Sequence, residues 1–305
     1  MTEDHFVIIG NGPAANSAAL TLRECAPDTR VTMISRELVR QYKPKLLPDF
    51  VAGKLSEEEL YVRPLAFYKE HGIKLRLGQE VVDVDFAARR VTLAHKEVVG
   101  YSGLIIAVGG KPYIPAPLQV FEDFMMTLKT ISDAHAWIER LSRTESVLMI
   151  GGDLTSLAFT RALLSLGKNV YFILDEDSFW PLRLTREIRD QVAQRLVSRG
   201  VNVVECRRLK RLARVSEKSV EVVTDTDRLK VGVVGAFFGL VPDVKFLAHT
   251  GIHVERGVLV DEHLKTRFDG VYAVGIALRF TIRSFGIIGF PSGTVTLKTS
   301  GRSQR

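Results

Sequence analysis

The stretch His5–Glu24, HFVIIGNGPAANSAALTLRE, decides the fold of this 305-residue chain. An apolar run that reads as a strand enters a glycine turn, and an Ala/Leu-rich helix follows it. The next apolar run, RVTMIS at 30–35, reads as a second strand. Strand, turn, helix and strand in this order predict a βαβ unit with a parallel strand pair.

The turn at 10–15, GNGPAA, fits the pattern GxGxxA of dinucleotide-binding units. Gly10 permits the tight turn, Gly12 lets the backbone approach a pyrophosphate, and Ala15 is small enough for close packing of helix on strand. Backbone N–H groups at the helix start would hold the phosphates. The alternative is a purely structural turn. The residues predicted to bind the cofactor here are Gly10, Gly12, Pro13, Ala14 and Ala15.

The ribose end of this predicted site departs from the pattern. An acid usually ends the second strand and binds the ribose hydroxyls. Here that place is Ser35, which can hydrogen-bond a hydroxyl but forms no charge-assisted bond. Arg36 follows it, and Glu37 lies beyond the strand end. We include Ser35 and Arg36 among the predicted cofactor-binding residues.

The same plan recurs later in the chain. VLMIGGDLTSLAF at 147–159 reads as strand, turn and helix, and NVYFIL at 169–174 as the next strand. Three prolines in KPYIPAPLQ at 111–119, and later FFGLVPDV at 237–244, read as two domain crossings. We expect an α/β fold of two Rossmann-like domains, the second inserted in the first. The predicted limits are 1–117 with 236–305 for the first domain and 118–235 for the second.

Two further segments carry structural expectations. SEEELYVRPLAFYKEHG at 56–72 is expected to be helical, because Ser56 and three glutamates suit the positive end of a helix. Residues 73–110 have short apolar runs broken by turn residues, which predicts an antiparallel meander that returns to a buried strand.

Composition narrows the class of protein. Apolar residues make up 46% and charged residues 25%, as in globular proteins, and no apolar run is long enough to span a membrane. The acidic N-terminal start is unlike a signal peptide, which favours a cytoplasmic location. The two cysteines, Cys25 and Cys206, lie far apart in sequence and form no local redox dithiol.

The formal net charge of +7 includes the basic run RRLKRLAR at 207–214. Such a run can bind nucleic acid, but no aromatic residues interleave for base stacking. We interpret it as a solvated surface and expect no nucleic-acid partner. No metal ligand set is predicted.

Taken in order, several segments resemble FAD-dependent pyridine nucleotide-disulfide oxidoreductases. The nearest branch is that of NADH:rubredoxin reductases and the flavin domain of NADH-dependent nitrite reductases. The resemblance covers Phe6 to Gly275. It implies an FAD domain built from both ends of the chain, an inserted NAD(P)H domain, and electron transfer from NADH through flavin to a small-molecule or small redox-protein acceptor. The segments are HFVIIGNGPAANSAALTLRE, YKPKLLPDFVAGK, LIIAVGGKPYIP, VLMIGGDLTSLAF, GLVPDV, GVLVDEHLKT and GVYAVG.

The resemblance also assigns residues to the flavin. AVGG at 107–110 matches a family segment that lies along the cofactor, with Val108 in place of a threonine. A cation after a tyrosine lies near the flavin in the family, and after Tyr42 the candidates are Lys43 and Lys45. A cation there would favour the reduced, anionic flavin; the alternative is that both lysines are solvated. The further cofactor-binding positions are Val82, Ala107, Val108, Gly109, Gly275 and Ile276.

The second turn departs from the family's NADH site. Gly151 holds the first glycine position, but Asp153 takes the second and brings a negative charge toward the pyrophosphate. The acid that would hold the ribose is replaced by Leu174, and strand alternation turns the next residue, Asp175, the other way. Ala158 replaces a helix glutamate near the nicotinamide. We expect the fold to survive and NAD(P)H binding to be doubtful; the positions assigned to it are Gly151, Asp153 and Asp175.

The likeness ends at Gly275. The family places an aspartate next, which binds the ribityl chain, and then a helix; this chain has Ile276 and a stretch of poor helix propensity. The family's C-terminal interface domain is expected to be absent, through divergence or a frame change. Two functions stay open: an impaired FAD-dependent oxidoreductase, or a catalytically silent nucleotide-binding remnant.

Overall fold

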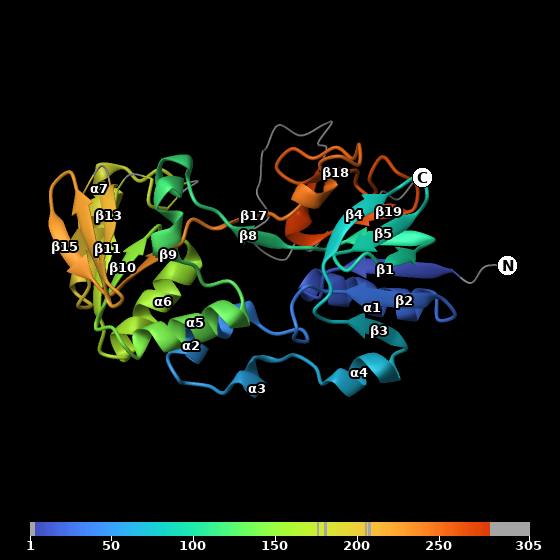
Figure 1. Cartoon of the computed structure of the whole chain (residues 1–305), viewed down its shortest axis with the longest axis horizontal. Helices are drawn as coiled ribbons and strands as arrows, with labels where there is room; N and C mark the ends of the chain where they lie inside the picture. The colour runs from blue at the N-terminus through green and yellow to red at the C-terminus, as the bar shows by residue number, and fades with distance from the viewer. Residues whose placement is uncertain (1–3, 176, 180–181, 205, 207–208, 281–305) are drawn as a thin grey trace, which may run out of the picture.

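The computed structural model describes residues 4–280, except 176, 180–181, 205 and 207–208. Two lobes lie end to end (Figure 1). Each lobe contains a five-stranded sheet, and a short two-stranded ladder lies between the lobes.

The first lobe is built on a sheet of order β19-β7-β1-β2-β3, whose neighbours all pair in parallel. Its central strand β1 is the apolar run that the sequence analysis begins from, and helix α1 follows it directly. A smaller antiparallel sheet of β4, β5 and β6 forms most of the meander predicted at 73–110. The first predicted strand is corrected, because β3 pairs in parallel with β2 and belongs to the main sheet. The bounds are β1 His5–Ile9, α1 Pro13–Cys25, β2 Arg30–Ile34, α4 Leu65–Glu70, β3 Ile73–Arg76, β4 Val81–Asp85, β5 Arg90–Leu93, β6 Val98–Gly100, β7 Gly103–Ile106 and β19 Val271–Ala273.

The second lobe repeats this plan with a sheet of order β12-β11-β10-β16-β9, again parallel throughout. Its helices and an antiparallel sheet of β13, β14 and β15 complete the lobe. The bounds are η2 Ala116–Phe124, β9 Met125–Met126, α5 Ile131–Leu141, β10 Ser146–Ile150, α6 Leu154–Ser165, β11 Asn169–Ile173, α7 Arg186–Val197, β12 Asn202–Val204, β13 Leu209–Ser216, β14 Ser219–Thr224, β15 Arg228–Val231 and β16 Val233–Ala236.

Strand membership confirms the predicted insertion. The first sheet takes β19 from the chain that follows the second lobe and places it beside β7. The chain leaves through β8 (Gly110–Pro112) and returns through β17 (Leu240–Pro242), and these strands pair antiparallel (Figure 1). The predicted residue limits of the two domains stay a prediction.

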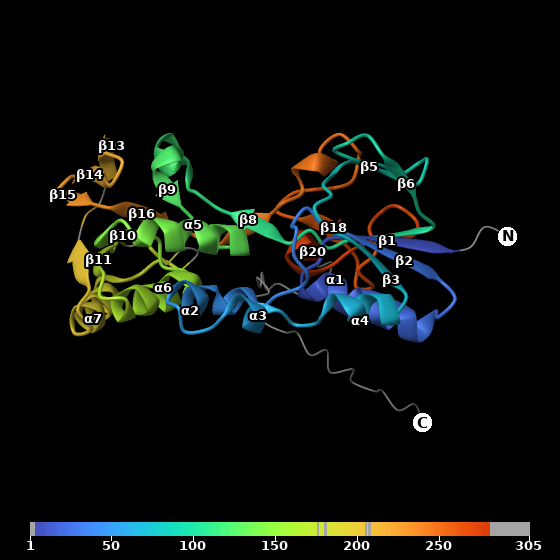
Figure 2. The ribbon, with the colours of Figure 1, turned by 60° about the horizontal axis from the view of Figure 1, so that its bottom comes forward.

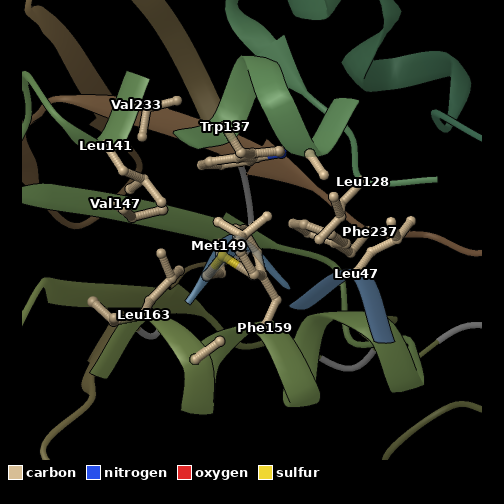
Figure 3. Packing of buried hydrophobic residues seen from close by; sticks show 14 of the residues in the cluster. Leu47, Leu128, Trp137, Leu141, Val147, Met149, Phe159, Leu163, Val233 and Phe237 are labelled. Carbon is tan, nitrogen blue, oxygen red and sulfur yellow. The ribbon is translucent and has the colours of Figure 1, made fainter. Parts of the chain in front are cut away.

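One segment of the first lobe crosses to the second, and no local sequence pattern predicts this crossing. Residues 42–61 form a loop closed by a bridge between Tyr42 and Tyr61, and it carries η1 (Pro44–Leu46), α2 (Leu47–Val51) and α3 (Glu57–Leu60). Helix α2 lies beside α5 and α6 (Figure 2). Leu47 is 1% exposed within the core of the second lobe, near Phe159 and Phe237 (Figure 3).

The helix predicted at 56–72 is broken, so that expectation is corrected. α3 ends at Leu60 and α4 begins at Leu65, with Tyr61 and Pro64 in extended conformations between them. Proline has no N–H and pushes the residue before it out of the α region, so the chain straightens at Pro64.

The chain after Gly275 is not α-helical in its described part. Residues Gly275–Ala277 form the short turn η4, and β20 (Leu278–Phe280) then pairs in parallel with β18 (Val258–Val260). The rest of the predicted divergent tail, 281–305, lies outside the described residues. No helix in the described part has the length and apolar character to cross a membrane.

Candidate functional site

A cavity of about 430 Å³ opens at the carboxyl ends of β1, β2 and β7. The carboxyl ends of parallel strands meet at one sheet edge, which is where open α/β sheets bind ligands. Ten of the predicted site residues line this cavity. They are Gly10, Gly12, Pro13, Ser35, Arg36, Val82, Ala107, Val108, Gly109 and Ile276.

The first turn has the geometry of a ligand cradle. Gly10 has φ +123°, and a Cβ there would lie 2.2 Å from the carbonyl oxygen of Ala107, so no other residue fits. Gly12 faces open space, with no atom within 4 Å of an added Cβ. Gly12 is the N-cap of α1 and supplies no side-chain cap, which leaves the positive end of the helix to a ligand.

Ala14 and Ala15 are not among the residues that line the cavity. Ala15 is fully buried under the turn, as its predicted packing role requires. The Cβ of Ala14 lies 3.0 Å from where a Cβ of Gly275 would be, so Gly275 permits close approach of η4 to α1. These residues shape the turn from beneath.

Two buried polar atoms in the cavity wall have no hydrogen-bond partner among the described residues, namely Arg40 Nε and Gln79 Oε1. Buried polar groups are nearly always paired in folded proteins. A polar ligand in the cavity would supply these partners. The open glycine turn and the two orphaned groups therefore fit an adenine dinucleotide such as FAD.

A cluster of three side chains lies deeper in the same cavity. The Tyr42 hydroxyl donates to Glu37 Oε2 at 2.8 Å, and Lys129 Nζ lies 3.6 Å from Glu37 Oε1. Burial, then the charge of Glu37, raises the pKa of the Tyr42 phenol, which therefore stays protonated. Lys129 comes from the second lobe, and no local sequence pattern marks it.

The lysines predicted to flank the flavin lie elsewhere. Lys43 and Lys45 are both exposed, and only Pro44 between them lines the cavity. The lysines that do line the cavity are Lys129 and Lys245. The assignment of Lys43 and Lys45 to the flavin stays a prediction.

The ribose end of the cavity is crossed by an ion pair. Arg36 Nη1 lies 2.7 Å from Asp243 Oδ2, and Asp243 donates its backbone N–H to the Gly109 carbonyl oxygen at 3.2 Å. Arg36 follows β2 and Gly109 follows β7, so the ion pair joins the two sides of the Gly10 turn. Ser35 is buried and its Oγ accepts the Glu37 N–H at 3.2 Å.

Ile276 stands at the cavity rim and is 45% exposed. It is apolar, so it offers no acceptor for a hydroxyl-bearing chain. Its Cγ2 lies 3.3 Å from where a Cβ of Gly110 would be, which places it against the strand that leads to the second lobe.

The second turn has the same backbone plan. Gly151 has φ +88°, and a Cβ there would lie 2.3 Å from the Phe237 carbonyl oxygen. A Cβ on Gly10 would meet the Ala107 carbonyl oxygen in the same way. The sequence similarity of the two turns therefore reflects the same bend at the end of a central strand.

Asp153 closes this second turn from within. It is the N-cap of α6: its Oδ1 accepts the Ser156 N–H at 2.8 Å and its Oδ2 accepts the Gly239 N–H at 3.2 Å. Burial raises the pKa of this carboxyl against the lowering effect of these bonds. The carboxylate takes the helix N–H groups that a pyrophosphate would use in an open turn.

Phe179 covers the neighbouring glycine. A Cβ on Gly152 would lie 2.8 Å from the Phe179 ring, so that ring rests directly on the turn. Leu174 is buried in the core of the lobe. Asp175 Oδ1 accepts hydrogen bonds within its own loop, from Ser178 Oγ at 2.8 Å and the Asp177 N–H at 2.9 Å. Asp153 and Phe179 therefore both lie against the glycines of this turn.

The second cavity, of about 280 Å³, contains no residue of this turn and lies against β9 and α5. Among the described residues, no group of three or more His, Cys, Asp or Glu side chains is placed to hold a metal ion. Both cysteines, exposed Cys25 and buried Cys206, are outside any disulfide.

The chain is similar to known reductases along most of its length. The ferredoxin–NAD(+) reductase component of the anthranilate 1,2-dioxygenase system of Burkholderia cepacia is 30% identical, over 90% of this chain and 68% of its own. Rubredoxin-NAD(+) reductase of Pseudomonas putida is 24% identical, over 88% of this chain and 71% of its own. Putidaredoxin reductase, in its covalent complex with putidaredoxin, has a TM-score of 0.82 at 21% identity, over 92% of this chain and 69% of that one.

The chain thus spans about two thirds of the length of these relatives. The family model of the pyridine nucleotide-disulphide oxidoreductases matches residues 4–284, which include both turns and both lobes. With the open first turn and the inserted second sheet, this match places the chain in the pyridine nucleotide-disulphide oxidoreductase family.

Proposed function

We propose that this chain binds FAD at the Gly10 turn and acts as an oxidoreductase that passes electrons to a small redox protein or a small molecule. Members of its family are FAD-binding, NAD(P)H-dependent reductases. The names of two relatives specify ferredoxin and rubredoxin reduction, which supports an acceptor of this class. The absence of a local dithiol pair supports a reducing cytoplasm as its location.

One observation carries the proposal. The Gly10 turn leaves the start of α1 accessible to a ligand, whereas Asp153 and Phe179 fill the Gly151 turn. Gly12 and the start of α1 would hold the pyrophosphate, and the backbone of Ala107–Gly109 would lie along the cofactor. Lys129 is paired with Glu37, whereas Lys245 forms no ion pair with a described residue and would stabilise negative charge in that cavity. Bound FAD would accept and deliver the electrons, while these residues hold and orient it.

We further propose that electron entry from NAD(P)H through the second lobe is impaired. Asp153 already satisfies the helix start and Phe179 covers Gly152, so a nucleotide must displace both. The same observation favours the second candidate function, a nucleotide-binding module without turnover. Anaerobic mixing with NADH separates them: slow, weakly saturating bleaching of the flavin supports an impaired reductase, and no bleaching supports the silent module.

The Gly12→Asp variant tests the FAD site. Gly12 has φ −76° and faces open space, so aspartate fits the backbone but places a charged side chain in the cavity. Gly100→Asp is the matched control, because Gly100 is exposed on β6 and its nearest atom is 4.0 Å from an added Cβ. Each protein is mixed with FAD and then passed through gel filtration. We expect wild type and Gly100→Asp to retain flavin absorbance and Gly12→Asp to lose it. Equal flavin retention by Gly12→Asp refutes this site.

A further inference from the structure

The ribose end of the cavity has a serine and an arginine where a site for an unphosphorylated ribose has an acid. At a βαβ turn, an acid after the second strand binds the ribose hydroxyls, whereas an arginine nearby accommodates a 2′-phosphate. Here Ser35 and Arg36 hold that place, and both line the cavity. A hydroxyl beside a guanidinium suits an anion, because both donate hydrogen bonds.

The cavity wall holds other charged groups besides Arg36 and Asp243, and one of them, Arg40, is paired with Glu58. Glu37 is held by Tyr42 and Lys129, so its charge is already compensated. Lys245 is exposed, lines the cavity and forms no ion pair with a described residue. Glu80, also exposed, is the one opposing charge in the lining without such a partner among the described residues. Arg36 is therefore the decisive group.

We infer that the ribose end of the Gly10 cavity recognises a phosphate on the adenosine 2′-hydroxyl, so that nucleotides of the NADP(H) class bind there more tightly than those with a bare ribose. The inference rests on the proposed function in one respect, because it takes the Gly10 turn as an adenosine site. It adds that FAD, whose ribose is bare, shares this cavity with a competing class of nucleotide.

Asp243 is the internal competitor for Arg36. Nη1 of the guanidinium lies 2.7 Å from Asp243 Oδ2, and a guanidinium carries five N–H donors. A phosphate monoester offers three acceptor oxygens and a charge of roughly −1.5 to −2. The carboxylate of Asp243 carries a single negative charge. Arg36 therefore exchanges Asp243 for the phosphate, or bridges the two. Removing the Asp243 charge frees Arg36 for the nucleotide.

The test measures three probes by calorimetry on the full chain: adenosine 2′,5′-bisphosphate, adenosine 3′,5′-bisphosphate and 5′-AMP. We expect the 2′,5′-bisphosphate to bind ~10-fold or more tightly than 5′-AMP, as loss of a charged hydrogen bond predicts. The 3′,5′-isomer carries the same charge on the neighbouring oxygen. Equal binding of the two isomers means charge attraction without recognition and overturns the inference.

Three variants assign the effect to the named residues. Arg36→Glu restores an acid and should reverse the order of 2′,5′-bisphosphate and 5′-AMP. Asp243→Asn should strengthen 2′,5′-bisphosphate binding by a larger factor than 5′-AMP binding. Arg90→Glu is the control, because Arg90 is exposed on β5 beside Asp85 and lies outside the cavity lining. An unchanged order in Arg36→Glu overturns the inference.

FAD retention by the same protein is measured from its flavin absorbance. This measurement separates failure of the present inference from failure of the proposed function. If FAD is retained and 5′-AMP binds as tightly as the 2′,5′-bisphosphate, this inference is wrong and the proposed function stands. If none of the three probes binds and FAD is not retained, the Gly10 turn is no adenosine site and both fail.

Discussion

In the second turn, the side chain of Asp153 occupies the place that a bound phosphate would take. Its two carboxylate oxygens cap α6 and hold the Gly239 N–H. We predict that Asp153→Ala lowers the free energy of unfolding by about 1–2 kcal/mol, the loss found for such caps. Thr185→Ala is the control: Thr185 caps exposed α7 through a longer 3.4 Å contact with the Ile188 N–H, and its loss should be roughly 0.5 kcal/mol. Urea unfolding measures both; equal losses contradict the role of Asp153.

The buried carboxylate also makes stability depend on pH. Burial raises the pKa of Asp153, so the native chain binds this proton more tightly than the unfolded chain does. The contribution of Asp153 to the free energy of unfolding therefore grows as pH falls from neutrality toward about 4, the ordinary carboxyl range. Asparagine keeps one acceptor and does not titrate. We predict that wild type gains stability relative to Asp153→Asn over this window; a constant difference contradicts the raised pKa.

At the scale of elements, the short helix α2 belongs to the core of a lobe that is distant in sequence. Leu47 is 1% exposed there. We predict that Leu47→Ala lowers the free energy of unfolding by about 2–5 kcal/mol, because it leaves a cavity between α2, α5 and α6. Leu65→Ala, at a side chain that is 54% exposed on α4, should change it by less than about 0.5 kcal/mol. Denaturant titration followed by circular dichroism compares them, and similar losses would place α2 outside the core.

The β10–α6 turn can be reopened if its closure is the cause of weak NADH binding. Asp153→Gly removes the internal anion, and Phe179→Ala uncovers Gly152. We predict that the double variant is reduced by NADH faster and with tighter saturation than wild type in stopped-flow bleaching. Phe179→Ala alone leaves the Asp153 cap and should change little. Fast, tight reduction of the unaltered chain would contradict the closed turn.

At the scale of the whole molecule, the 42–61 loop couples the two lobes. Side chains of this loop complete the core of the second lobe, while the chain before and after it, in β2 and α4, belongs to the first. We predict a single calorimetric unfolding transition, shifted upward as one peak by a nucleotide that binds only the first lobe. At 100 times the dissociation constant the shift corresponds to about 2.7 kcal/mol. Two peaks, of which only one moves, would mean that the lobes unfold independently.

The sequence predicts those features that neighbouring residues decide. The Gly10 and Gly151 turns and the inserted sheet follow from local patterns. Asp153 also carried a local signal, since aspartate at a helix start is a common N-cap. Phe179 on Gly152 and Lys129 beside Glu37 depend on contacts between distant segments, for which the sequence has no local pattern. The break before α4 has a local signal, because Pro64 disfavours helix at the residue before it.

The ladder of β8 and β17 makes the inserted lobe separable in principle. The chain departs and returns on adjacent strands, about 4.8 Å apart, so a two-residue hairpin connection would join Pro112 to Leu240. A minimal protein made in this way keeps the Gly10 turn and the strands that flank it. Removal of the second lobe also exposes Leu47, Phe50 and Val51 to water. Because an exposed apolar patch promotes association, polar replacements at these positions decide whether the fragment stays monomeric. The inserted lobe is thus held to the first at two places, the β8–β17 strand pair and the 42–61 loop.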